Sequence, residues 1–262
     1  MLTSLSNFKT EPSEWAVEQP ICISVNGIAH AVMMVTPSEL ENFSVGFAYG
    51  EKIISDIGQL RDISISEDTH NITTTDSDIP IACIVVDLTI SPRQLKTYKE
   101  KQTFRRGLTS CGLCGSAALS EALPELEPLK PAGLPSPEEL LDIHKRTQFT
   151  AGMHVAHLMN PSGTQLISQH DIGRHNALDK ALGFALRKGI NLHQHYAILS
   201  SRCSVELVQK AVRAGLSTLV HLSSPSNLAI EMAQHYQLNL IQVTRSGEIK
   251  VHARSQSDKV ES

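Results

Sequence analysis

Residues 196–243 read YAILSSRCSVELVQKAVRAGLSTLVHLSSPSNLAIEMAQHYQLNLIQV, and this stretch decides the fold class. Three short apolar segments alternate in it with two amphipathic segments. The apolar segments lie near 196–201, 217–222 and 238–243, and the amphipathic ones near 204–214 and 226–236. A strand–helix–strand–helix–strand order predicts parallel strands joined by right-handed crossovers. We therefore expect an α/β region with a mostly parallel sheet, which would bind ligands beyond the carboxyl ends of its strands.

The region upstream of this stretch has a different pattern. Asn26-Gly27 separates two β-rich segments and predicts a hairpin. Thr36-Pro37-Ser38-Glu39 has the form of a capping box and predicts a helix with proline at its first position. Short strands are expected within 62–89, followed by a basic, helical segment over 92–106. These features predict an α+β region.

A proline-rich connector precedes the α/β region. Ser136-Pro137-Glu138-Glu139 caps another predicted helix, a hairpin is expected from 154–159 and 165–169, and a helix from about 174 to 188. We predict a flexible arm at 1–18, an α+β N-terminal domain at 19–135 and an α/β C-terminal domain at 136–262.

Composition limits the classes of function. The chain has 262 residues, a formal net charge of -4 and a pI near 6.3, which argues against a nucleic-acid binder. No segment has the roughly 20 apolar residues that a membrane span needs, and no signal peptide is visible. Five cysteines are too few, and odd in number, for a disulfide scaffold. We therefore expect a cytoplasmic protein in a reducing compartment.

The most informative cysteines are Cys111 and Cys114, which lie three residues apart among three glycines. Arg105 and Arg106 precede them, and a predicted helix start follows Cys114. Positive charge and a helix N-terminus both favour the thiolate form of a cysteine. Since the thiolate is the nucleophile in sulfur chemistry, these features predict a reactive pair.

Three interpretations of this pair remain open. A zinc site needs about four ligands, usually from two such pairs, so histidines would have to complete it. A thioredoxin-like redox motif normally follows a strand, whereas this pair follows a basic helical segment. The third is a structural loop with two idle thiols, which the neighbouring glycines and positive charge argue against. Cys22 and Cys83 lie in apolar strands and are interpreted as small core residues. Cys203 precedes a helix, so a reactive thiol and a packed one both stay open.

A second group of polar residues lies at a strand-to-helix junction in the α/β region. Asp171 can cap the helix, and Arg174 and His175 present donors at a helix N-terminus, which is a natural anion site. The alternative is a capped surface helix with solvated charges. Val243 through Glu248, which include Arg245, end the last predicted strand. Such loops at one sheet edge suggest a nucleotide or phosphate ligand.

Together these segments resemble the formate dehydrogenase accessory sulfurtransferase family, often called FdhD, over about residues 18–250. The matching residues are Asn26-Gly27, Met33-Met34, Thr36-Pro37, Gly46-Phe47, Gly50-Glu51, Ile53-Ile54, Thr109-Ser110-Cys111-Gly112-Leu113-Cys114-Gly115, Asp171-Ile172-Gly173-Arg174-His175-Asn176-Ala177-Leu178-Asp179-Lys180, Ser200-Ser201-Arg202, Val208-Gln209-Lys210-Ala211, Ala214-Gly215 and Ser224 to Ala229.

The resemblance implies a cytidine-deaminase-like C-terminal domain, a homodimer and a persulfide on Cys111. Sulfur would come from a cysteine desulfurase. It would pass to the molybdenum of the bis(molybdopterin guanine dinucleotide) cofactor before insertion into formate dehydrogenase, and a guanine nucleotide could mimic this bound substrate. The family's cofactor-binding segment maps onto Val243, Thr244, Arg245, Ser246, Gly247 and Glu248. Deaminase activity is not implied, since that chemistry needs Pro-Cys-x-x-Cys and Cys111 follows Ser110.

In our hypothesis Cys111 carries out the sulfur transfer and Cys114 assists it. The phosphates of the cofactor are bound by Arg174, His175, Lys180 and Arg245. We expect no metal site and no nucleic-acid or membrane partner. The rival hypothesis is a non-catalytic nucleotide-binding chaperone in which Cys111 and Cys114 form a zinc clip. A dithiol oxidoreductase is the third.

Overall fold

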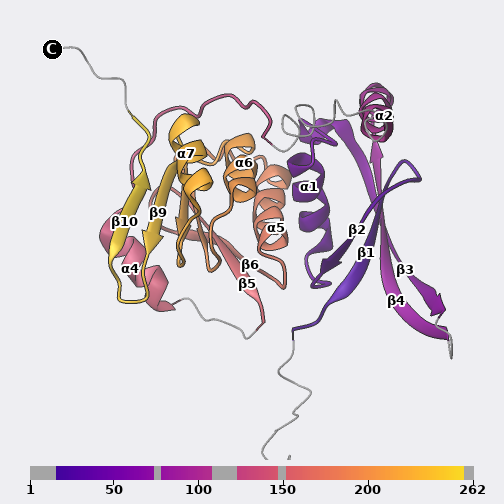
Figure 1. The fold of residues 1–262 in the computed structure, drawn as a ribbon, viewed down its shortest axis with the longest axis horizontal. Coiled ribbons are helices and arrows are strands. Elements are labelled where there is room, and N and C mark those ends of the chain that lie inside the picture. The colour runs from indigo at the N-terminus through magenta and orange to yellow at the C-terminus, as the bar shows by residue number, and fades with distance from the viewer. Residues whose placement is uncertain (1–15, 74–77, 108–122, 147–151, 257–262) are drawn as a thin grey trace, which may run out of the picture.

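A computed structural model describes residues 16–73, 78–107, 123–146 and 152–256. It contains two β-sheets, each covered by helices, with the helices of the two halves facing each other between the sheets (Figure 1). Cys111 and Cys114 lie outside the described residues, as does most of the predicted arm at 1–18. The predicted domain limits at 18 and 135 stay predictions.

The first sheet has the order β2-β1-β4-β3. Its strands are β1 (Gln19–Val25), β2 (Ile28–Val35), β3 (Leu60–Thr73) and β4 (Asp78–Ile90). The predicted hairpin is confirmed: β1 and β2 pair antiparallel across Asn26 and Gly27, which both have positive φ, at 48° and 75°. β1 also pairs parallel with β4. The helices of this half are α1 (Leu40–Gly50), a short 3₁₀ turn (Ile57–Gln59) and α2 (Pro92–Gly107).

The second sheet has the order β10-β9-β8-β7-β5-β6. Its strands are β5 (His154–Met159), β6 (Gln165–Asp171), β7 (Tyr196–Leu199), β8 (Thr218–His221), β9 (Asn239–Val243) and β10 (Ile249–Ala253), and its helices are α4 (Pro137–Arg146), α5 (Arg174–Arg187), α6 (Val205–Arg213) and α7 (Asn227–His235). The predicted strand–helix alternation is confirmed, because β7, β8 and β9 are parallel.

The prediction of a mostly parallel sheet is wrong. β5 pairs antiparallel with both β6 and β7, and β10 pairs antiparallel with β9, so the second sheet is mixed. A tight turn follows β9 and reverses the chain, so that β10 pairs with β9 as an edge strand. The apolar pattern of the sequence does not predict this strand. The mixed α/β class is confirmed, and the cytidine-deaminase likeness stays a prediction.

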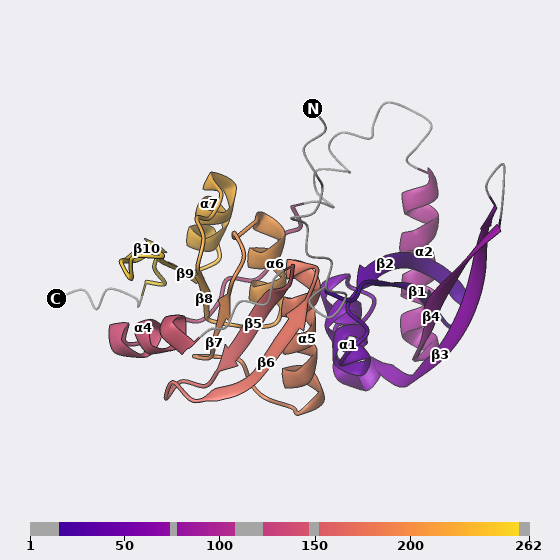
Figure 2. The ribbon, with the colours of Figure 1, turned by 90° about the horizontal axis from the view of Figure 1, so that it is seen from below.

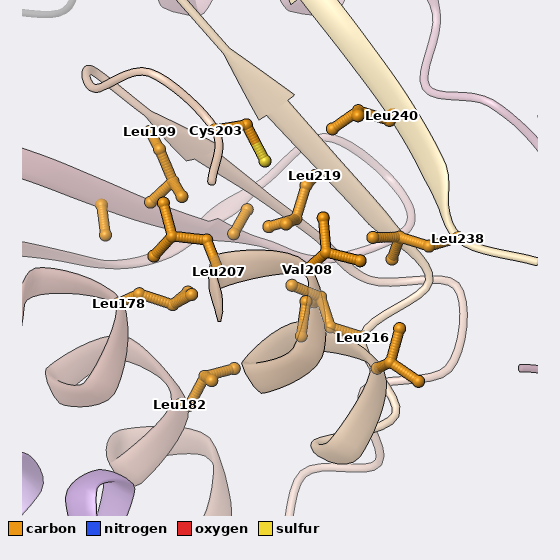
Figure 3. Packing of buried hydrophobic residues seen from close by; sticks show 14 of the residues in the cluster. Leu178, Leu182, Leu199, Cys203, Leu207, Val208, Leu216, Leu219, Leu238 and Leu240 are labelled. Atoms are coloured by element: carbon orange, nitrogen blue, oxygen red, sulfur yellow. The ribbon is translucent and has the colours of Figure 1, made fainter. Parts of the chain in front are cut away.

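Buried apolar side chains form one cluster on the first sheet and two on the second, where the smaller cluster packs α4 against the strands through Leu140 and Ile143. The larger cluster of the second half lies between the sheet and α5, α6 and α7, with Leu199 and Leu219 of the strands facing Leu178 and Leu207 of the helices (Figure 3). The cluster of the first half lies between the sheet and α1 and α2. The segment leading to α4 lies along the second half, where the Leu129 amide donates to the Tyr236 carbonyl at 2.9 Å. None of the described helices is long and apolar enough to cross a membrane.

Glycines bring α1 and α5 into close contact. A Cβ atom at Gly46 would lie 1.9 Å from the carbonyl oxygen of Asp179, and one at Gly183 would lie 1.9 Å from the carbonyl oxygen of Asn42. Both obstacles are backbone atoms, which cannot swing aside as a side chain can. The two halves are therefore held together by a helix contact that only glycine permits at these positions.

We predict that Gly183→Ala destabilises the protein by about 1–3 kcal/mol, because the added methyl group must push the two helix backbones apart. Gly133→Ala is the matched control, since its Cβ would meet nothing within 4 Å. Urea unfolding of both variants measures the difference. Equal stability of the two would show that the α1–α5 spacing is not fixed by glycine.

The two predicted capping boxes have different outcomes. At α4 the box is confirmed: the Glu139 amide donates to Ser136 Oγ and the Ser136 amide donates to the Glu139 carboxylate, each at 3.2 Å. At α1 the box is wrong, because the helix begins at Leu40 after Glu39 with φ 53° and no side-chain cap. Thr36 Oγ1 instead accepts a hydrogen bond from the Ile172 amide of the other half. A tertiary contact therefore replaces the local cap.

Candidate ligand-binding edge

The carboxyl ends of four strands lie at one edge of the second sheet. β7, β8 and β9 are parallel, and β6 runs in the same direction because both β6 and β7 are antiparallel to β5. The loops after these strands lead into α5, α6, α7 and the β9–β10 turn. This is the edge where α/β sheets bind ligands.

Arg174 and His175 are the first two residues of α5, as predicted. His175 Nε2 lies 2.9 Å from a Glu206 carboxylate oxygen and 3.3 Å from Ser204 Oγ, so it joins the starts of α5 and α6. Burial, together with the Arg174 charge, lowers the pKa of His175, although Glu206 opposes the shift. Arg174 is half-buried, and its Nε has no hydrogen-bond partner among the described residues. Arg174 therefore carries a buried donor that no described residue satisfies, whereas His175 is already held by Glu206.

Lys180 lies elsewhere, in a fully buried ion pair with Asp171 at 2.7 Å. Its ammonium also donates to the carbonyl oxygens of Thr36, at 2.9 Å, and His170, at 3.1 Å. Burial lowers the pKa of Lys180, and the hydrogen bond to Asp171 opposes this. Since its ammonium donates to groups inside the protein, Lys180 is not expected to bind the phosphates of a ligand.

Asp171 and its neighbours connect the two halves of the chain. Its carboxylate accepts from the amides of Gly173, at 2.9 Å, and Thr36, at 3.1 Å. Asn176 donates to Asp171 and to the Met34 carbonyl, both at 2.9 Å. The block that sequence reasoning assigned to a ligand thus also joins the end of β2 to the start of α5. No spacing rule predicts this role, because its partners lie about 135 residues apart.

A second buried pair supports the same contact. Both carboxylate oxygens of Asp179 lie 2.8 Å from Lys210 Nζ of α6. Burial raises the pKa of Asp179 to about 6, against the opposing effect of Lys210. Arg213 donates to the Gly50 carbonyl at 2.9 Å, which fixes the end of α1 to α6.

The predicted cofactor segment Val243 through Glu248 forms the turn between β9 and β10. Val243 is buried, whereas Arg245, Ser246 and Glu248 are exposed. Thr244 Oγ1 accepts from the Glu248 amide at 3.0 Å and shares a hydrogen bond with Ser246 Oγ at 2.9 Å. Glu248 pairs with Lys250 at 3.2 Å. The turn therefore carries one exposed cation, Arg245, and one exposed acid, Glu248.

Cys83 is buried, as predicted, whereas Cys22, which was also predicted to be a core residue, is only half-buried. Cys203, for which packing and reactivity were both open, is buried. Burial raises the pKa of Cys203 to about 12, so its thiol stays protonated at neutral pH and is a poor nucleophile. The described residues contain no group of three or more His, Cys, Asp or Glu side chains that could hold a metal ion. A zinc clip would depend on Cys111 and Cys114, which lie outside the described residues.

Sequence reasoning missed His221 at the end of β8. It is fully buried, and its Nδ1 lies 3.1 Å from the Ser201 carbonyl oxygen, so Nδ1 carries the proton. Burial lowers the pKa of His221 to about 4. The folded pKa therefore lies below the unfolded value of about 6.5. The contribution of neutral His221 to the free energy of unfolding is present above pH 6.5 and is lost as the pH falls toward 4.

We predict that His221→Gln reduces the loss of stability between pH 7.5 and pH 5 by about 2 kcal/mol, because the replacement does not titrate. Asp179, whose raised pKa has the opposite effect on acidification, is unchanged in the variant. Urea unfolding at both pH values measures the two losses. Parallel pH dependence in wild type and variant would show that His221 is not responsible.

These features define an α/β protein of two sheets with a candidate ligand-binding edge on the second. The chain belongs to the FdhD/NarQ family, whose profile matches residues 16–258. It is 36% identical over 238 residues to the sulfur carrier protein FdhD of Burkholderia mallei, covering 87% of this chain and 84% of that one. It is 32% identical over 248 residues to the sulfur carrier protein FdhD of Bordetella bronchiseptica, covering 92% and 86%.

The fold also matches a solved structure. A crystal structure of a Desulfotalea psychrophila protein, described as a formate dehydrogenase accessory protein, superposes with a TM-score of 0.64 at 22% identity. The match covers 90% of this chain and 87% of that one. This match confirms the fold, and the family profile with the curated relatives confirms the family resemblance found in the sequence.

Proposed function

We propose that this protein is a sulfur carrier that acts as a sulfurtransferase through a persulfide on Cys111. Membership of the FdhD/NarQ family over nearly the whole chain carries this proposal, together with curated relatives named as sulfur carrier proteins. The pair Cys111 and Cys114, within Thr109-Ser110-Cys111-Gly112-Leu113-Cys114-Gly115, supplies the thiols that the chemistry needs.

The reaction begins on a cysteine desulfurase that carries a persulfide. The Cys111 thiolate attacks the outer sulfur, the sulfur–sulfur bond of the donor breaks, and the donor cysteine leaves as a thiolate. Cys111 then holds the transferred sulfur as its own persulfide. Attack by the Cys114 thiolate on the inner sulfur would release sulfide and leave a Cys111–Cys114 disulfide, so Cys114 assists release rather than loading.

The acceptor in this proposal is the molybdenum of the bis(molybdopterin guanine dinucleotide) cofactor, which is substrate rather than resident cofactor. The carboxyl edge of the second sheet would hold its phosphates. The N-termini of α5 and α6 and the Arg174 guanidinium supply positive potential there, and the turn Thr244 to Glu248 would flank it with Arg245. The cofactor then passes to formate dehydrogenase. The homodimer and the cytoplasmic location stay predictions.

We predict that Arg174→Ala weakens binding of guanosine diphosphate, a soluble mimic of half of the cofactor, by about tenfold, because a charge-assisted hydrogen bond to phosphate is lost. The exposed Arg254, next to β10, provides the matched control Arg254→Ala. Isothermal titration at low salt measures both affinities. An unchanged affinity in Arg174→Ala would remove the start of α5 from the proposed phosphate site.

A further inference from the structure

Helix α2 is the most strongly charged element of the structure. Its sequence, PRQLKTYKEKQTFRRG over Pro92–Gly107, contains six basic residues and one acidic residue, a formal charge of +5. The whole chain has a net charge of -4. The positive charge is thus concentrated on one helix of an otherwise acidic protein.

One face of α2 packs on the first sheet and another faces outward. Tyr98 is buried in the core of the first half, with Leu95 packed against it, and Gln94 donates to the Ile53 carbonyl at 2.7 Å. Arg93 and Lys96 are exposed and make no ion pair within the described residues. Their charges therefore face solvent rather than an internal partner.

The C-terminal half of α2 extends past the strands of the first sheet. Figure 2 shows no other described element beside it. The helix ends at Gly107, four residues before Cys111. Only three residues, 108–110, separate the end of the helix from Cys111 in the sequence.

We propose that the exposed basic face of α2 is the docking surface for the protein that delivers sulfur, and that this donor presents an acidic surface to it. The inference rests on the proposed persulfide at Cys111. A donor must bring its own persulfide into contact with that thiolate, so its surface lies beside the end of α2 during transfer. Opposite charge on the two surfaces speeds such encounters and orients them.

The sulfur acceptor has a different place in this scheme. The proposed phosphate site lies at the carboxyl edge of the second sheet, whereas α2 belongs to the first half, on the far side of α1 (Figures 1 and 2). Loading and delivery therefore use different surfaces, and a change on α2 affects loading alone.

The test is a charge reversal on α2, Arg93→Glu with Lys96→Glu, in the full chain. The matched control is Lys188→Glu with Lys145→Glu, which changes the net charge equally at exposed positions of the second half. Persulfide formation is followed with two donors, a cysteine desulfurase with cysteine and glutathione persulfide. Urea unfolding establishes that both variants fold.

We expect kcat/KM for the desulfurase to fall at least tenfold in the α2 variant at about 50 mM salt, and the difference to shrink at about 0.5 M salt as screening increases. Loading from glutathione persulfide and loading of the control variant stay at wild-type rates. Desulfurase kinetics equal to wild type, equal losses with both donors, or a loss confined to delivery to the acceptor would each overturn the docking proposal. Failure of wild type to load from either donor would instead overturn the proposed function itself.

Discussion

Replacing Cys111 by alanine is expected to lower sulfur uptake from a cysteine desulfurase by at least a factor of about 1,000, because no other group in the transfer scheme replaces the nucleophile. The variant should fold normally, since alanine removes only a sulfur atom. Transfer of labelled sulfur from cysteine to the protein measures the effect.

Cys203→Ala is the matched control for this experiment. Its thiol is buried and its pKa is raised to about 12, so it should not take part in transfer. We expect labelled sulfur to reach this variant at the wild-type rate. Uptake retained in Cys111→Ala but lost in Cys203→Ala would show that Cys203, not Cys111, accepts the sulfur.

The second large effect concerns stability rather than transfer. Lys180→Met should destabilise the protein by about 3–5 kcal/mol, because Asp171 would remain as a buried carboxylate without its cation. The exposed Lys188 provides the control Lys188→Met, which should change stability by less than about 0.5 kcal/mol. Urea unfolding at neutral pH compares the two.

A double variant makes this prediction sharper. Asp171→Leu in the Lys180→Met background removes the uncompensated charge and should recover part of the loss. Recovery stays incomplete because the amides of Thr36 and Gly173 lose their acceptor. A loss below about 1 kcal/mol in Lys180→Met would mean that this pair does not hold the two halves together.

Local patterns predicted much of the fold. Asn26-Gly27 fixed the first hairpin, Ser136 and Glu139 fixed the start of α4, and the apolar segments from 196 to 243 gave the three parallel strands. Each of these features depends on neighbours in sequence or on a strong apolar period. The same local logic failed at Thr36, where a hydrogen bond from Ile172 replaces the expected cap.

The candidate site was harder to predict because its residues have long-range partners. Arg174 and His175 begin a helix at the expected edge, but nothing in the spacing shows that Glu206 holds His175 or that Asp171 holds Lys180. The contact through Gly46 and Gly183 likewise depends on which two helices meet. The edge strand β10 was missed because a tight turn, rather than a helix, follows β9.

The most direct test of the central claim is intact and peptide mass spectrometry of the protein after incubation with a cysteine desulfurase and cysteine. We expect one additional sulfur atom on the peptide that contains Cys111, and its removal by a thiol reductant. A Cys111 peptide that stays unmodified while the desulfurase itself carries persulfide would contradict the account.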